Sequence, residues 1–263
     1  MTYNTLVFEN EGAVGRIILN RPASMNAISD EMATELLAVI GAAARRDKLR
    51  VLVIEGAGRA FCCGADLKGI LANLRSSSGL KFVEFLSRIQ AVFTALRELH
   101  KPTIASINGM ALAGGLELAM SCDLVIAARS ARIGDAHANF GVLPGGGGGT
   151  LLSRYIGEKK ANHLLFTGEN WSAEALERAG LVSLVVDDHE LRHVTDALAR
   201  KVSEKSPIVI SRLKQLVGEG SRLLPRDAFE LEMALLQAHV KTNDFKEGLT
   251  AFSEKRTPKY SGT

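Results

Sequence analysis

The stretch that decides the fold reads TIASINGMALAGGLELAMS and covers residues 103–121. Its first five residues, Thr103 to Ile107, are mostly apolar or β-branched and predict a strand. The residues from Gly114 to Ser121 predict a helix, and another strand is predicted from Leu124 to Ala127. A strand, a helix and a further strand in this order imply a right-handed crossover and a largely parallel sheet. The sequence therefore predicts the α/β class.

The segments on both sides of this stretch extend the pattern. Before it we expect a hairpin of two strands at Thr5–Glu9 and Gly15–Leu19, a helix capped by Ser29, a strand at Val51–Ile54 and a helix over about 79–99. From about Asp187 to Arg256 only helical segments are predicted, and no linker precedes them. We therefore expect a core over residues 1–190 and a C-terminal helical region over residues 191–263.

The composition is that of a globular protein, with 46% hydrophobic and 23% charged residues among 263. No apolar run approaches the length needed to cross a membrane. The cysteines, Cys62, Cys63 and Cys122, cannot build a disulfide framework and are expected to be reduced. The N-terminal residues lack the features of a targeting segment, so a cytoplasmic location is expected. No histidine has partners at metal-ligand spacing, and no metal site is predicted.

The net charge of +3 suits an anionic nucleotide ligand without demanding one. A short basic cluster is formed by Arg45, Arg46, Lys48 and Arg50. Such a cluster is more often a solvated helix end than a nucleic-acid site. RNA binding by a non-catalytic protein is therefore the alternative function from another class, and a nucleic-acid partner is not expected.

Two turns rich in small residues follow predicted strands. At Gly114-Gly115 the chain enters a helix, where backbone N–H groups and the helix dipole favour negative charge. The turn at residues 61–66, Phe-Cys-Cys-Gly-Ala-Asp, also follows a strand and could offer a second N–H group. Two converging amides form an oxyanion hole. Each turn alone is more often a site of tight packing, so the pairing needs support from the rest of the sequence.

That support comes from motifs that occur in a fixed order along nearly the whole chain. They are Asn20-Arg21-Pro22 with Asn26-Ala27, residues 60–67 (AFCCGADL), residues 107–119 (INGMALAGGLELA), Cys122-Asp123, and residues 247–256 (EGLTAFSEKR). Together they resemble the crotonase family, the enoyl-CoA hydratases and isomerases.

The resemblance implies a fold of repeated ββα units around a spiral, and C-terminal helices that mediate trimer contacts, with a hexamer as a common final state. It also implies an acyl-CoA thioester as substrate; coenzyme A is part of that substrate, and no separate cofactor is expected. The matched positions place the oxyanion-hole donors at the Ala65 and Gly114 amides. They place coenzyme A binding at six residues: Cys63, Asp66, Leu67, Lys68, Phe252 and Lys255. In the family, the positions of Phe252 and Lys255 often serve the site of a neighbouring subunit.

Glu117 follows Gly114 by three residues, so one helical turn returns it toward the predicted anion site. It matches the first catalytic glutamate of the family, and burial there should raise its pKa. His137 occupies the position of the family's second glutamate. An imidazole suits acid–base work, but His137 could equally line the pocket, and both interpretations stay open.

The missing second glutamate bears on the reaction. Hydration of a 2-enoyl-CoA ranks first, because it is the commonest reaction of the family. Double-bond isomerisation ranks second, and racemisation or decarboxylation also needs only an enolate and one or two proton carriers. All of these reactions use the same oxyanion hole.

The run from Gly145 to Gly149 precedes a predicted helix. Five glycines at a helix N-terminus can form an anion-binding nest. No Gly-Lys-Ser/Thr follows, which excludes a phosphate-binding P-loop. Glycine there could instead permit close helix packing.

Overall fold

The computed structural model describes residues 3–74 and 80–263. Its larger sheet has six strands in the spatial order β1-β2-β3-β5-β7-β10. Only β1 is antiparallel to its neighbour β2; the other pairs are parallel. The strands are β1 (Leu6–Glu11), β2 (Val14–Leu19), β3 (Val51–Gly56), β5 (Thr103–Ile107), β7 (Leu124–Ala128) and β10 (Leu184–Val186). The predicted hairpin and parallel sheet are confirmed.

A smaller sheet has four strands in the order β4-β6-β8-β9, and its first three are parallel. Its strands are three residues each: β4 (Ala60–Cys62), β6 (Met110–Leu112), β8 (Arg132–Gly134) and β9 (Asn170–Ser172). The chain passes from β3 to β4, from β5 to β6 and from β7 to β8, with helices after each pair. These are the repeated ββα units that the resemblance implies.

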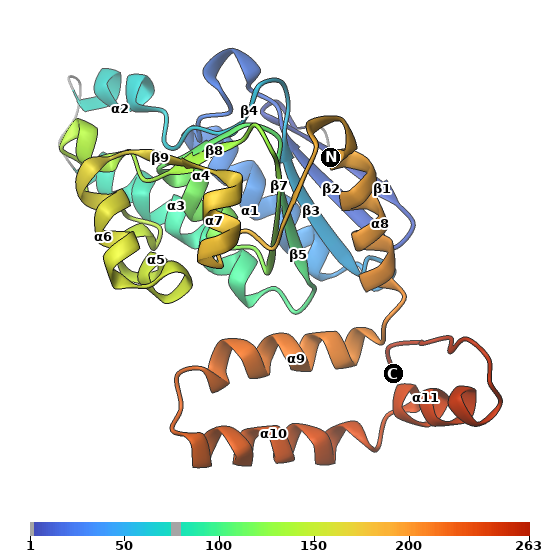
Figure 1. The fold of residues 1–263 in the computed structure, drawn as a ribbon. Coiled ribbons are helices and arrows are strands. Elements are labelled where there is room, and N and C mark those ends of the chain that lie inside the picture. The colour runs from blue at the N-terminus through green and yellow to red at the C-terminus, as the bar shows by residue number, and fades with distance from the viewer. Residues whose placement is uncertain (1–2, 75–79) are drawn as a thin grey trace.

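The helices surround the two sheets, except for those near the C-terminus (Figure 1). They are α1 (Asp30–Ala44), α2 (Leu67–Leu74), α3 (Leu80–Glu98), α4 (Gly114–Met120), α5 (Gly148–Ile156), α6 (Glu158–Thr167), α7 (Ala173–Ala179), α8 (Leu191–Ser203), α9 (Pro207–Gly220), α10 (Pro225–His239) and α11 (Asn243–Ser253). Short 3-10 helices lie at η1 (Pro22–Ser24), η2 (His137–Phe140) and η3 (Asp188–Glu190). No helix in the described ranges is long and apolar enough to span a membrane.

Local signals position the helices as expected. The Ser29 hydroxyl accepts a hydrogen bond from the Met32 N–H at 3.1 Å, and so caps α1. At the other end of α1, the buried Lys101 ammonium donates to the carbonyls of Ala43 and Arg46 at 2.7 and 2.6 Å. A cation there satisfies carbonyls that have no partner within the helix.

The last three helices lie apart from the sheets, and α9 and α10 run side by side below them in Figure 1. Lys214 on α9 ties this region to the core: its ammonium donates to Asp123 at 2.8 Å and to the Leu96 and Lys101 carbonyls. In contrast, α8 packs on the larger sheet. A division of the chain at residue 190 stays a prediction.

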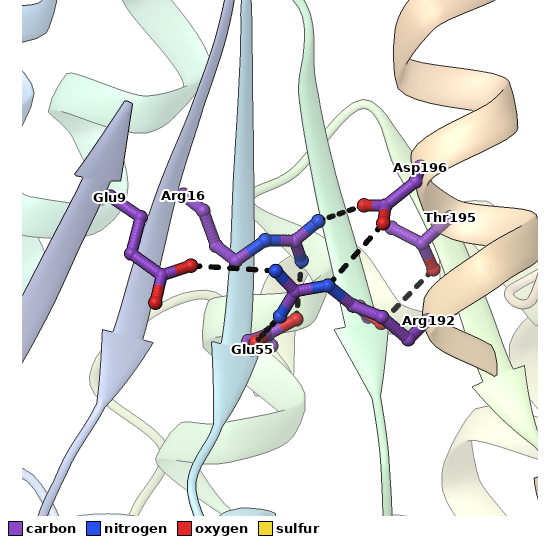
Figure 2. Close-up of polar contacts among 7 residues, drawn as sticks. Glu9, Arg16, Glu55, Arg192, Thr195 and Asp196 are labelled. Atoms are coloured by element: carbon purple, nitrogen blue, oxygen red, sulfur yellow. Dashed lines mark hydrogen bonds and ion pairs between the residues drawn. The ribbon is translucent and has the colours of Figure 1, made fainter. Parts of the chain in front are cut away.

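An ion-pair network joins α8 to the first strands of the larger sheet (Figure 2). Arg16 on β2 is 4% exposed, and its guanidinium contacts Glu55 on β3 and Asp196 on α8. Arg192, also on α8, reaches Glu55 at 2.8 Å and Glu9 on β1 at 3.4 Å. Removing one partner of such a network leaves the opposite charge buried without a counter-charge, which costs folding free energy.

We expect Arg16→Met to lower the free energy of unfolding by about 3–5 kcal/mol, because Glu55 and Asp196 lose their buried partner and keep only the half-exposed Arg192. Urea denaturation followed by circular dichroism measures this loss. Arg226→Ala is the matched control, since Arg226 and Glu230 form an exposed pair on α10; it should cost less than about 0.5 kcal/mol. Equal costs for the two variants would refute a structural role for the network.

Candidate functional site

The site begins where β4 and β6, neighbours in the smaller sheet, each lead into a turn. The turn after β4 contains Gly64 and Ala65, and the turn after β6 contains Ala113 and Gly114. A Cβ placed on Gly114 would lie 3.3 Å from the Gly64 Cα and 3.6 Å from the Ala65 nitrogen. The two turns are therefore in direct backbone contact, which brings the two predicted oxyanion-hole amides to one place.

Glycine is required in this contact. A Cβ on Gly115 would lie 1.9 Å from the Cys62 carbonyl oxygen, and Gly64 has a φ of +90°. The non-glycine Ala113 also has a positive φ, 51°, with ψ of −118°. Such a backbone conformation costs of order 1–3 kcal/mol and is typical of functional sites.

The amides of Ala65 and Gly114 are available to a ligand. Neither N–H donates a hydrogen bond to any other residue within 3–74 and 80–263. Gly114 is the first residue of α4, so its N–H has no partner within the helix. Both Ala65 and Gly114 line a cavity of about 470 Å³. Two residues that line one cavity and have unused N–H groups can supply the donors that an oxyanion hole needs.

Glu117 lies one helical turn into α4 and also lines this cavity, although only 2% of the residue is exposed. Its Oε1 accepts hydrogen bonds from the N–H groups of Gly146 and Gly148 at 2.7 and 2.8 Å. Burial raises the pKa of Glu117, an effect that these N–H groups and His137 oppose. A carboxylate whose pKa is raised is a better proton acceptor.

The glycine run thus forms an anion-binding turn whose anion is the Glu117 carboxylate itself. Side chains are excluded there: a Cβ on Gly146 would lie 2.1 Å from the Phe93 ring and 2.8 Å from Glu117 Oε2. Arg97 on α3 fixes the turn from outside by donating to the Gly146 carbonyl at 3.0 Å. The sequence pointed to a nest but not to its occupant.

His137, the first residue of η2, lines the same cavity. Its Nδ1 lies 3.0 and 2.9 Å from the two oxygens of Asp135, which is 1% exposed. Burial lowers the pKa of His137, but the hydrogen bond and charge of Asp135, together with the charge of Glu117, outweigh burial and raise it. Asp135 was not among the predicted site residues, because it lies two residues before position 137, which matches the family's second glutamate.

Apolar side chains form most of the cavity wall. They include Met25, Leu67, Phe82, Leu86, Ile89, Met110, Leu112, Phe140, Val142 and Leu143. Phe140 and Leu143 are 67% and 86% exposed, so the cavity opens to the surface beside them. Its lining fits an apolar chain that leads inward to Glu117.

Among the predicted coenzyme A residues, Cys63 and Leu67 line the cavity. Burial raises the pKa of the Cys63 thiol, which keeps it protonated and poorly nucleophilic. The Asp66 carboxylate pairs with Arg21 at 2.8 Å and accepts from the Gly69 N–H at 3.2 Å. Burial would raise the pKa of Asp66, but these bonds lower it. The carboxylate of Asp66 therefore shapes the start of α2.

The remaining three predicted residues do not line the cavity. Lys68 is exposed at the start of α2. Phe252 is 85% exposed and lies in α11, and Lys255 comes two residues after this helix. Helix α11 lies far from α4 in Figure 1. Within one chain the structure does not bring Phe252 or Lys255 to the site, and a role at a neighbouring subunit stays a prediction.

Two members of the basic cluster have structural partners. Arg46 stacks on Phe8, with its guanidinium carbon 5.1 Å from the ring centre. Arg50 donates to the carbonyls of Ser203 and Tyr260 at 3.2 and 2.5 Å. These contacts give Arg46 and Arg50 a structural role. Among the described residues there is also no group of three histidine, cysteine or acidic side chains that could hold a metal.

We expect Gly115→Ala to abolish activity on an acyl-CoA substrate, because its Cβ would push β4 away from α4 and separate the two amides. Steady-state kinetics measure the effect, which should exceed about 10²-fold in kcat. Gly41→Ala is the control: Gly41 lies in α1, where a Cβ would meet only the Arg45 side chain at 3.7 Å. Activity in Gly115→Ala comparable to that of Gly41→Ala would contradict the proposed geometry.

Comparison with known proteins agrees with this geometry. Residues 9–263 match the family described as enoyl-CoA hydratase/isomerase. The chain is 35% identical to the short-chain-enoyl-CoA hydratase of Clostridium acetobutylicum, over 97% of each chain. It is 34% identical to the crotonyl-CoA hydratase of Syntrophomonas wolfei, again over 97% of each. An enoyl-CoA hydratase structure from Bacillus anthracis superposes with a TM-score of 0.94 at 33% identity, covering 99% of this chain and 100% of the other. The chain belongs to the enoyl-CoA hydratase/isomerase family.

Proposed function

We propose that this protein is an enoyl-CoA hydratase, which reversibly adds water across the double bond of a 2-enoyl-CoA. The observation that carries the proposal is the single cavity shared by two free amides, a buried carboxylate and an imidazole. The names of the relatives at 34–35% identity support the same reaction. Coenzyme A enters as part of the substrate, and we propose no separate cofactor.

In the proposed reaction, Ala65 and Gly114 donate hydrogen bonds to the thioester oxygen. The Glu117 carboxylate takes a proton from water as the water oxygen bonds to Cβ of the substrate. The electrons of the double bond move into the thioester and form an enolate, which the two amides stabilise. Cα then takes a proton from His137, and proton transfer from Glu117 back to His137 restores the site.

Isomerisation is the second candidate, because His137 replaces the second carboxylate. Moving a double bond requires removal of one proton from carbon and its return at another carbon, and Glu117 with His137 could perform both transfers. Mass spectrometry distinguishes the candidates, since hydration adds the mass of water and isomerisation leaves the mass unchanged. Racemisation also leaves the mass unchanged, whereas decarboxylation loses carbon dioxide.

We expect Glu117→Gln to lower kcat for hydration by about 10²- to 10⁴-fold, because the amide cannot accept the proton of water. His137→Ala should lower kcat far more than it changes KM. The test incubates a panel of enoyl-, dienoyl- and hydroxyacyl-CoAs with each variant and identifies products by mass. Unchanged turnover in Glu117→Gln would refute the proposed reaction, and unchanged turnover in His137→Ala would assign that residue to packing.

We also propose a trimer, or a hexamer built from two trimers. Phe229, Met233 and Leu236 on α10 and Val240 at its C-cap recur at intervals of four, three and four residues and are 41–70% exposed. This spacing places them on one face of the helix, as in a helix that packs against a partner. A cytoplasmic location also stays a proposal, supported by three unpaired cysteines.

We expect Phe229→Glu combined with Met233→Glu to reduce the mass in solution to that of one chain, because two charges would be buried against a neighbour. Light scattering after size-exclusion chromatography measures the mass. The control replaces Arg226 and Glu230, an exposed ion pair on a flank of the same helix, with glutamine. A monomeric parent protein, or an unchanged mass in the double glutamate variant, would refute the proposed interface.

A further inference from the structure

The contact between Asp135 and His137 determines which nitrogen of the imidazole is free to exchange a proton. An ionised carboxylate only accepts hydrogen bonds, and both Asp135 oxygens lie within 3.0 Å of His137 Nδ1. Nδ1 must therefore carry a proton. Nε2 is left as the nitrogen that can exchange a proton with a substrate.

The backbone holds this pair in a fixed geometry. Asp135 follows the last residue of β8, and its Oδ1 also accepts a hydrogen bond from the His137 N–H at 3.1 Å. The His137 side chain is 13% exposed. Within the described ranges, His137 is the sole hydrogen-bond donor to the Asp135 carboxylate. A carboxylate buried in this way requires compensation, which only His137 provides.

Glu117 is the other charged group that acts on His137 within the described residues. A Cβ on Gly148 would lie 2.8 Å from Asp135 Oδ2 and 3.2 Å from Glu117 Oε1, so both carboxylates surround this glycine. Helix α6 also packs on η2. There the Asn139 side-chain amide donates a hydrogen bond to the Gly168 carbonyl, and neither of these residues has a titratable side chain. The cavity side adds the apolar Phe82 and Leu86. Asp135 and Glu117 are therefore the two charged groups that act on His137 among the described residues.

We propose that Asp135 is a positioning residue: it fixes the His137 ring with Nε2 toward the cavity and holds the imidazole protonated, so that the pair donates the proton to Cα of the substrate. The inference rests on the proposed hydration. When Nε2 gives up its proton, the ring remains protonated at Nδ1, and Asp135 keeps it in place for reprotonation.

Asp135→Asn tests the inference. The amide preserves the shape of the side chain but removes its charge, and it can donate to Nδ1 and so stabilise the wrong tautomer. We expect kcat to fall by about 10²-fold or more with KM changed only a few-fold. The loss of kcat with rising pH should also begin at a lower pH in the variant than in the unchanged protein. His137 acts as an acid, so kcat falls as the pH rises through the pKa of His137. Removing the charge of Asp135 lowers that pKa.

The matched control is Glu169→Gln. Glu169 pairs with His163 at 2.8 Å, both side chains are more than half exposed, and neither lines the cavity. Kinetics and pH profile should match those of the unchanged protein. An Asp135→Asn variant that also matches them would overturn the inference.

Nitrogen-15 NMR of His137 provides a test that needs no substrate and no folded variant. In the unchanged protein we expect Nδ1 to remain protonated across the titration and Nε2 alone to lose its proton, at a pH above that of an ordinary histidine. An unprotonated Nδ1 at neutral or higher pH would overturn the inference. If no acyl-CoA is hydrated while Nδ1 shows the expected protonation, the proposed hydration fails and the positioning by Asp135 stands.

Discussion

The site depends on one steric constraint, the contact between the turn after β4 and the N-terminus of α4. Gly115 lies so close to the Cys62 carbonyl that no side chain fits between them, and Gly64 approaches Gly114 in the same way. Because β4 and β6 are parallel neighbours, both turns emerge from the same edge of the smaller sheet. Two backbone amides that are far apart in sequence can therefore face one cavity. The orientation of α4 then places Glu117 in that cavity.

The second requirement is compensation for buried charge. Glu117 leaves water when α4 packs, and the N–H groups of Gly146 and Gly148 replace part of its lost hydration. Glycine suits positions 146 and 148 for two reasons. Its N–H group donates to Glu117, and the missing side chain leaves room for Phe93 and the Glu117 carboxylate. Arg97 holds the same turn through the Gly146 carbonyl. The residual effect of burial is what raises the pKa of Glu117.

Sequence reasoning succeeded where a signal was local or extended. The strand at Thr103–Ile107 and the cap at Ser29 appear as predicted, because periodicity and capping are properties of a few consecutive residues. The strands of the smaller sheet were not predicted, since three residues are too short to show a period. Asp135 was passed over because its importance arises from a contact. Asp-x-His is unremarkable in sequence, and only the turn between β8 and η2 directs the carboxylate onto the ring.

A histidine at position 137, where the family has its second glutamate, changes the electrostatics of the site. Asp135 and Glu117 both act electrostatically on residue 137, so another carboxylate there would add a third like charge to the group. An imidazole instead pairs with Asp135. The exchange also alters the acid: a protonated carboxyl group is neutral, whereas a protonated imidazole carries positive charge. As the substrate gains negative charge in forming the enolate, a cation at His137 would stabilise it along with the Ala65 and Gly114 amides. In the proposed mechanism, the second proton carrier is therefore a charged acid in place of a neutral one.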